Sequence, residues 1–179
     1  MKMKRNKRKI FKLIAFFVII ALAAVLYQFR FFGLMFFAAP YAERMRVGLL
    51  CKTDHQDLLE ACRELLRKVE TGELNTGFYT VRGGIFSPRS PEASQFPQVI
   101  LDLQPRDVFI RRDKYVTMEM HGGIDHFGVH AYPDDFKEPF KGFKYGDREI
   151  IPGLWYYDEN YVYEPNYDKR IDALMQKRK

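Results

Sequence analysis

The clearest pattern in the chain is a one-by-one alternation of apolar and polar residues on both sides of Gly122-Gly123. Strict alternation is typical of a β-strand that lays one face on a hydrophobic core, and two adjacent glycines favour a tight turn. We therefore predict two antiparallel strands, over residues 115–121 and 126–132, that form a hairpin. The apolar face of this hairpin consists of Val116, Met118, Met120, Phe127, Val129 and Ala131.

The register of the hairpin follows from its two faces. A shift by one residue would move every apolar side chain to the polar face, so the apolar sets of both strands must share one face. Pairing His121 with His126 across the turn meets this condition. The predicted pairs are then His121 with His126, Glu119 with Gly128, and Thr117 with His130.

A helix and further strands complete the predicted domain. Leucines at helical spacing predict an amphipathic helix over residues 54–70, with Thr53 as the N-cap residue of a capping box. Two apolar stretches, residues 107–112 and 148–157, predict one more strand each. The predicted fold class is α+β: an N-terminal transmembrane helix, followed by a small antiparallel β-meander of three to four strands that packs against one longer and two or three short helices.

The N-terminal region predicts a membrane anchor. Residues 13–29 carry no charge, and a helix of that length spans about 25 Å, close to the thickness of the hydrocarbon core. Residues 1–12 hold seven basic residues and no acid, so the N-terminus is predicted to be cytoplasmic. The predicted organisation is a basic tail at 1–12, a transmembrane anchor at 13–39, a connector at 40–52 and an extracytoplasmic domain at 53–179. The predicted localisation is the cell membrane, with a single pass.

A cleaved signal peptide is the alternative to this anchor. Ala21-Leu22-Ala23 has the small-x-small form of a cleavage site. Apolar sequence continues beyond it as far as Ala39, which favours retention of the anchor.

The charge distribution argues against nucleic acid as a partner. The net charge of +6 comes from the N-terminal tail, and the remainder of the chain has slightly more acids than bases. A nucleic-acid-binding domain needs a basic face of its own.

Cys51 and Cys62 are separated by a stretch of helix longer than a disulfide allows, so no disulfide is predicted. The predicted partners are membrane lipid, through residues 13–39, and a protein or glycan outside the cytoplasm.

The polar face of the hairpin carries the candidate chemistry. In the predicted register it gathers Glu119, His121, His126 and His130. Imidazole and carboxylate groups bind divalent metals and transfer protons near neutral pH, so these four residues are the candidate metal ligands and catalytic residues. A divalent metal is the candidate cofactor. Their spacing matches no established zinc motif, and the alternative is an ordinary polar sheet face.

An aromatic run provides a second candidate surface. Trp155, Tyr156, Tyr157 and Tyr161 are the candidate binding residues, since Trp and Tyr combine an apolar ring with a polar group. The alternative is that these rings pack against the sheet and the last helix.

Together the features of the sequence favour a membrane-anchored binding or envelope-assembly module over an enzyme. The alternatives are a metal-dependent or His/Glu acid–base enzyme that uses the 115–132 hairpin, and a cell-wall or glycan binder that uses the 155–163 run.

Overall fold

The computed structural model describes residues 16–27, 39–84, 87–111, 115–121, 126–134, 147–159 and 165–177. The chain divides into two compact units, Met1–Tyr41 and Ala42–Lys179. In the first unit, residues 16–27 form a helix whose large apolar side chains are exposed. Among the described residues, no helix combines the length and the apolar character needed to cross a membrane. The predicted tail lies outside the described residues, as does the predicted 13–39 anchor apart from residue 39 and the 16–27 helix.

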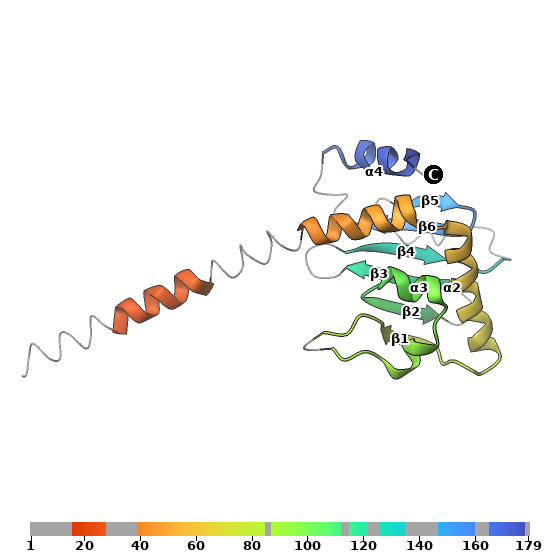
Figure 1. Ribbon diagram of the computed structural model, residues 1–179, viewed down its shortest axis with the longest axis horizontal. Helices are drawn as coiled ribbons and strands as arrows, with labels where there is room; N and C mark the ends of the chain where they lie inside the picture. Colours follow the sequence, from red (N-terminus) through yellow and green to blue (C-terminus); the bar gives the residue numbers. More distant parts are fainter. Residues whose placement is uncertain are drawn as a thin grey trace, which may run out of the picture. The chain divides into compact units, whose positions relative to one another are not determined.

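The second unit is an α+β domain built on a six-stranded antiparallel sheet (Figure 1), which confirms the α+β class of the prediction. The strand order in the sheet is β1-β2-β3-β4-β6-β5. Residues 39–47 form a helix that continues directly into a π-helical turn, η1. The strands are β1 (Gly77–Thr80), β2 (Asp107–Arg111), β3 (Tyr115–His121), β4 (Phe127–Ala131), β5 (Arg148–Ile151) and β6 (Leu154–Asp158). The other helical segments are η1 (Gly48–Lys52), α2 (His55–Glu70), η2 (Pro91–Gln95), α3 (Gln98–Leu103) and α4 (Tyr167–Gln176).

The prediction of three to four strands was wrong, and there are two reasons. The segment predicted as one strand over 148–157 turns back on itself at Pro152-Gly153, where Gly153 has a φ of +90°, and so gives both β5 and β6. A left-handed φ of this kind suits glycine because it has no Cβ. In addition, the short segment β1 pairs with β2 at the edge of the sheet. Four residues are too few to show a reliable alternation in the sequence.

Most of the predicted hairpin register is confirmed. Thr117 pairs with His130, and Glu119 pairs with Gly128. The predicted pair of His121 with His126 was wrong, because a β-bulge between Glu119 and His121 shifts the register and pairs His121 with Phe127. A bulge adds one residue to one strand, and no periodicity in the sequence marks its position. The predicted turn at residues 122–125 lies outside the described residues.

The long helix α2 has the predicted apolar stripe but begins one residue later than expected. Its N-cap is Asp54, whose carboxylate accepts hydrogen bonds from the backbone N–H groups of Gln56 and Asp57 at 2.9 and 3.1 Å. The predicted cap, Thr53, instead donates its hydroxyl hydrogen bond to the carbonyl of Gly48 at 2.9 Å. Threonine and aspartate are both favoured N-cap residues. Here the hydroxyl of Thr53 is bonded to η1, and Asp54 caps the helix. The stripe of α2 buries Leu58, Leu59, Cys62, Leu65, Leu66 and Val69.

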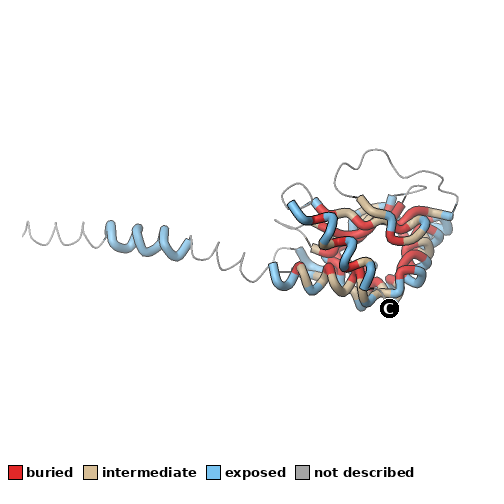
Figure 2. Tube along the Cα trace, turned by 90° about the horizontal axis from the view of Figure 1, so that it is seen from above, coloured by how far each residue is buried: buried red, intermediate tan, exposed pale blue. Residues whose placement is uncertain are grey.

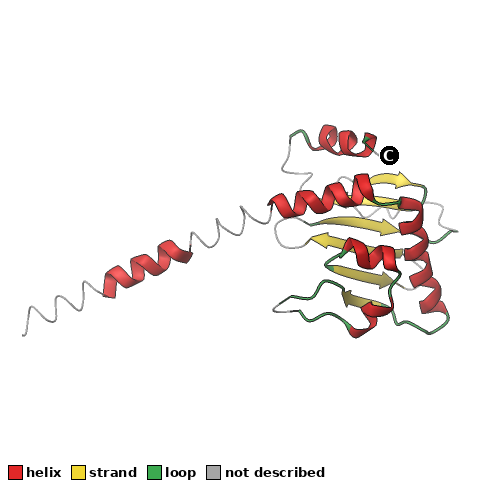
Figure 3. Cartoon of the chain, in the orientation of Figure 1, coloured by secondary structure: helices red, strands yellow, loops and turns green. Residues whose placement is uncertain are grey.

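Within the described residues, helices cover one face of the sheet, and we call the other face the open face. Helices α2 and α3 lie over one face, together with the helix that ends at η1 (Figure 1 and Figure 3). The buried residues concentrate between these helices and the sheet (Figure 2). The apolar residues predicted for the hairpin are all buried on this side, within one hydrophobic core. No described helix lies over the opposite face, which carries the polar side chains of β3 and β4.

Candidate functional site

The open face of the sheet contains a pocket of about 250 Å³, which we call the open-face pocket. Its lining comes from alternate positions of β2, β3, β4 and β6, because successive side chains of a strand point to opposite faces. Residues adjoining β5 and β6 complete it. The lining residues are Phe109, Arg111, Tyr115, Thr117, His130, Asp147, Tyr157 and Glu159.

His130 is a buried histidine in the lining of the open-face pocket. Its Nδ1 is 3.0 Å from the hydroxyl oxygen of Thr117. The ring stacks on Tyr157 with a centroid distance of 4.5 Å, and it is nearly perpendicular to the Tyr115 ring, with 5.6 Å between the two centroids. Burial, with a smaller contribution from the charge of Arg111, lowers the pKa of His130 to about 3. The imidazole is therefore neutral near pH 7, with one ring nitrogen protonated and the other free of a proton, so it can orient and contact a ligand but carries no charge there.

His130 should make the stability of the fold depend on pH. In the unfolded chain its pKa is near 6.5, so below that pH the unfolded state binds more protons than the folded state. The free energy of unfolding then falls as the pH decreases from about 6.5 towards 3. We expect His130 to account for a loss of about 2 kcal/mol between pH 7 and pH 5.

The measurement is denaturant unfolding at both pH values for the full chain in detergent micelles and for His130→Gln. Burial raises the pKa of Asp147 to about 6, which gives a slope of the opposite sign in the same range. The difference between wild type and His130→Gln isolates the histidine. An imidazole NMR titration with a pKa near 6.5 would contradict the prediction.

Gly128 and Tyr157 form the wall beside His130. Gly128 pairs with Tyr157 of β6, and a Cβ at position 128 would lie 1.9 Å from the carbonyl oxygen of Met118 and 2.9 Å from the Tyr157 hydroxyl. The tyrosine therefore fills the gap that glycine leaves in the polar face. Burial, reinforced by the nearby carboxylates of Glu119 and Glu159, raises the pKa of Tyr157 far above its usual value. Its hydroxyl stays protonated and can donate a hydrogen bond.

Asp147 is a site residue that the sequence did not suggest. Its Oδ1 atom is buried and has no hydrogen-bond partner within the described part of the chain. Buried carboxylate oxygens almost always accept a hydrogen bond, so this atom needs a donor from outside the described residues. Asp147 stands directly before β5, and the β5–β6 hairpin brings it next to Glu159 in the pocket. No local motif marks this arrangement.

The four predicted metal ligands are not gathered at one point. Glu119 Oε1 lies 3.3 Å from His126 Nδ1, so these two residues do meet. His130 lies in the open-face pocket, and the bulge leaves the ring of His121 facing Phe127 at a centroid distance of 6.4 Å. Among the described residues, no group of three or more His, Cys, Asp or Glu side chains is placed to hold a metal ion.

Glu119 also contacts Arg106, at 3.4 Å from Oε1. Burial raises the pKa of Glu119, while the charges of His126 and Arg106 oppose this effect without cancelling it. The two residues Glu119 and His126 are therefore a candidate acid–base pair at one end of the open face.

The aromatic run is divided between the two faces of the sheet. Tyr156 is fully buried on the covered side, whereas Trp155 and Tyr157 are partly buried and lie on the open face. Tyr161 lies outside the described residues. The predicted aromatic surface is thus reduced to Trp155 and Tyr157, and Tyr157 belongs to the pocket. Phe109 and Tyr115, from strands far earlier in the chain, complete the aromatic lining.

No family model, curated protein or solved structure matches the chain.

Proposed function

We propose that this protein is a membrane-tethered module that binds a saccharide unit in the open-face pocket, outside the cytoplasm. The observation that carries the proposal is the buried Oδ1 of Asp147, which has no hydrogen-bond partner in the described part of the chain and lies in a pocket lined by aromatic rings. A hydroxyl group of a ligand would supply the missing donor.

The chemistry of the lining favours a small ring with hydroxyl groups. Phe109, Tyr115 and Tyr157 offer apolar ring surface, and Thr117 and Glu159 offer polar groups beside it. The volume of about 250 Å³ is just below the range of about 300–1,000 Å³ typical of drug-sized ligands, which suits a single sugar unit. Such a unit could belong to a larger glycan, because no helix in the described part of the chain lies over this face.

The membrane tether is proposed from the N-terminal segment. Its apolar residues extend over 13–39, and the part that the structure describes, residues 16–27, is a helix with exposed side chains such as Phe17 and Ile19. A helix that is apolar all round needs a non-aqueous environment. The basic tail at 1–12 supports a cytoplasmic N-terminus and an external domain.

Binding can be measured on the full chain in micelles of a detergent without a sugar headgroup. Trp155, the single tryptophan, pairs with His130 on the open face and reports on the pocket by fluorescence. We expect saturable binding by at least one member of a panel of monosaccharides, amino sugars and N-acetylated sugars. Asp147→Ala should weaken that binding by about tenfold to a hundredfold, because a hydrogen bond to a charged group is lost.

Glu149→Ala is the matched control, since Glu149 is an exposed acid on β5 outside the pocket lining. It should leave the affinity unchanged. The proposal fails if no sugar in the panel binds saturably, or if both variants weaken binding equally.

Acid–base chemistry is a second candidate, favoured by the contact between Glu119 and His126. If the bound saccharide were cleaved, Glu119→Gln and His126→Ala should abolish the cleavage and leave binding intact. Retained cleavage in both variants would exclude this role. A metal-dependent form of the reaction has less support, because the described residues hold no ligand cluster.

A further inference from the structure

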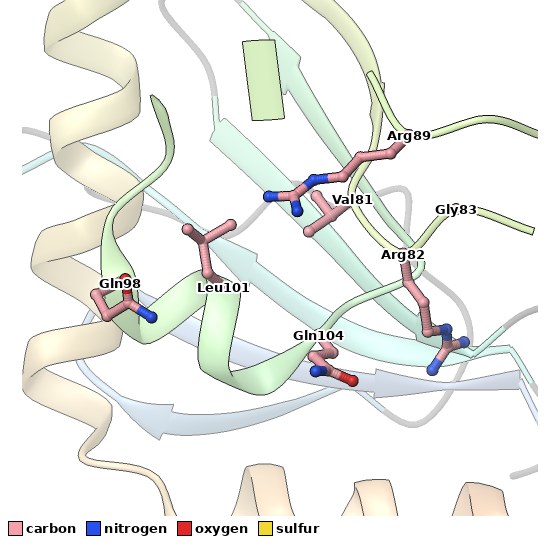
Figure 4. A pocket seen from close by; sticks show the side chains of 7 residues that line it. All are labelled: Val81, Arg82, Gly83, Arg89, Gln98, Leu101 and Gln104. Atoms are coloured by element: carbon pink, nitrogen blue, oxygen red, sulfur yellow. The ribbon is translucent and has the colours of Figure 1, made fainter. Parts of the chain in front are cut away.

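A second pocket lies at the other end of the sheet, beside β1, and shares no residue with the open-face pocket. Its volume is about 450 Å³, and it is enclosed by the segment that follows β1, the loop before η2, and α3 (Figure 4). We call it the arginine pocket. Its lining residues are Val81, Arg82, Gly83, Arg89, Gln98, Leu101 and Gln104.

The charge of this lining is entirely positive. Arg82 and Arg89 are its ionisable residues, and no acid lines the pocket. Arg89 makes no ion pair with any described residue. Its guanidinium donates a long hydrogen bond to the carbonyl of Ala93, at 3.5 Å. Other arginines of the domain do meet carboxylates, namely Arg46, Arg63, Arg106, Arg148 and Arg170. Arg89 therefore has a guanidinium group available for an external anion.

The two arginines play different parts. Figure 4 shows the guanidinium of Arg89 extended towards Val81 and Leu101, whereas that of Arg82 points the other way, towards the sheet. Arg82 donates to the carbonyl of Met120 at 3.3 Å and contacts the sulfur of Met45 at 3.1 Å. It is held in place and contributes its charge to the pocket. Val81 and Leu101 form an apolar wall beside Arg89, whose side chain is exposed and so accessible to an anion.

The backbone around the pocket is held in a defined conformation. Gln104 is the one non-glycine residue in the described chain with a positive φ, at +48°, and this strained position directly follows α3. The chain also passes very close to itself here, since a Cβ on Gly83 would lie 2.9 Å from the backbone nitrogen of Arg89. Positive φ angles in residues other than glycine are more common at binding sites than elsewhere.

We propose that the arginine pocket binds a phosphate group, with Arg89 as the main contact. The planar guanidinium presents two parallel N–H donors that match a phosphate oxyanion, and the side-chain amide of Gln104, elsewhere in the lining, is a further donor. The phosphate could belong to a small soluble molecule or to a phospholipid headgroup. This inference does not depend on saccharide binding in the open-face pocket.

The test uses the full chain in micelles of an amine-oxide detergent, which contains no phosphate. The side-chain amide signal of Gln104, which lines the pocket and is present in every variant, is followed by NMR while inorganic phosphate replaces chloride at constant ionic strength. We expect a saturable shift of this signal, and an affinity at least about tenfold lower in Arg89→Gln. Arg44→Gln is the matched control, because Arg44 is an exposed arginine of the same domain outside the pocket lining; it should bind phosphate as the wild type does.

A second arm identifies the source of the phosphate. Phosphatidylglycerol added to the micelles should shift the same signal if the ligand is a lipid headgroup, and should leave it unchanged if the ligand is a soluble phosphate. The inference is overturned if neither compound gives a saturable shift, or if Arg44→Gln weakens binding as much as Arg89→Gln, since the effect would then be one of overall charge.

Discussion

The Gly128→Ala variant is expected to lose more than about 3 kcal/mol of its free energy of unfolding, a large part of the 5–15 kcal/mol typical of a natural domain. The added methyl group would lie 1.9 Å from the carbonyl oxygen of Met118. That oxygen belongs to the backbone of β3, which cannot move without breaking its pairing with β4. The hydroxyl of Tyr157, 2.9 Å from the same position, blocks the other direction.

Denaturant unfolding of the full chain in micelles, followed by the fluorescence of Trp155, measures this loss. Gly48→Ala is the control, since it adds the same methyl group at a helical position with no atom within 4 Å. It should be neutral or slightly stabilising, because alanine favours a helix more than glycine does. Removing the tyrosine hydroxyl as well, in Gly128→Ala/Tyr157→Phe, should restore little, because the clash with the backbone remains. A cost below about 1 kcal/mol for Gly128→Ala would show that β3 and β4 are packed less closely than described.

The second large effect is expected at a buried ion pair on the covered side of the sheet. Arg46 and Asp158 are both buried, with 3.0 Å between Nε and Oδ2. The hydroxyl of Tyr156 accepts a hydrogen bond from the same Nε at 3.0 Å and donates one to Asp158 at 2.7 Å. Arg46→Met would leave the carboxylate of Asp158 buried without its counter-charge. We expect a cost of about 3–5 kcal/mol, the usual penalty for removing one member of a buried pair.

The double variant Arg46→Met/Asp158→Asn measures the interaction free energy between the two side chains. Because it removes both charges, it should cost less than the sum of the two single variants, by about 1–3 kcal/mol. Glu64→Gln is the control: Glu64 forms a partly exposed pair with Lys68 on α2, and its loss should cost no more than about 0.5 kcal/mol. Additive costs for Arg46 and Asp158 would mean that the two charges do not stabilise each other.

This ion pair also shows why residues 42–47, the later part of the helix before η1, belong to the domain. Arg46 connects them to β6, and Glu43 accepts hydrogen bonds from both Arg46 and Arg170, each at 2.7 Å. The charges and hydrogen bonds of these arginines outweigh the effect of burial and lower the pKa of Glu43. The segment predicted as a connector is therefore tied to β6 and to α4 by side chains that no sequence motif links.

Local pattern determined the elements that the sequence predicted well. The α+β class, the 115–132 hairpin with its apolar face, and the stripe of α2 all follow from periodicities of two and of about 3.6 residues. These periods come from the local backbone geometry of strands and helices, so a short stretch of sequence is enough to show them. Three features do not follow from local periodicity: the extra strands, the bulge before His121 and the use of Asp54 as N-cap. Each depends on a contact with another segment of the chain.

The composition of the candidate site was decided only by the tertiary structure. The sequence predicted that Glu119 and His130 lie on one face of the hairpin, because the two-residue period of a strand determines the face of each side chain. That Asp147 and Tyr157 join His130 depends on the order β4-β6-β5, in which strands distant in the sequence become neighbours. The period of a strand determines which face a side chain lies on, whereas the pairing of strands determines which other side chains it meets, and pairing is a property of the whole sheet.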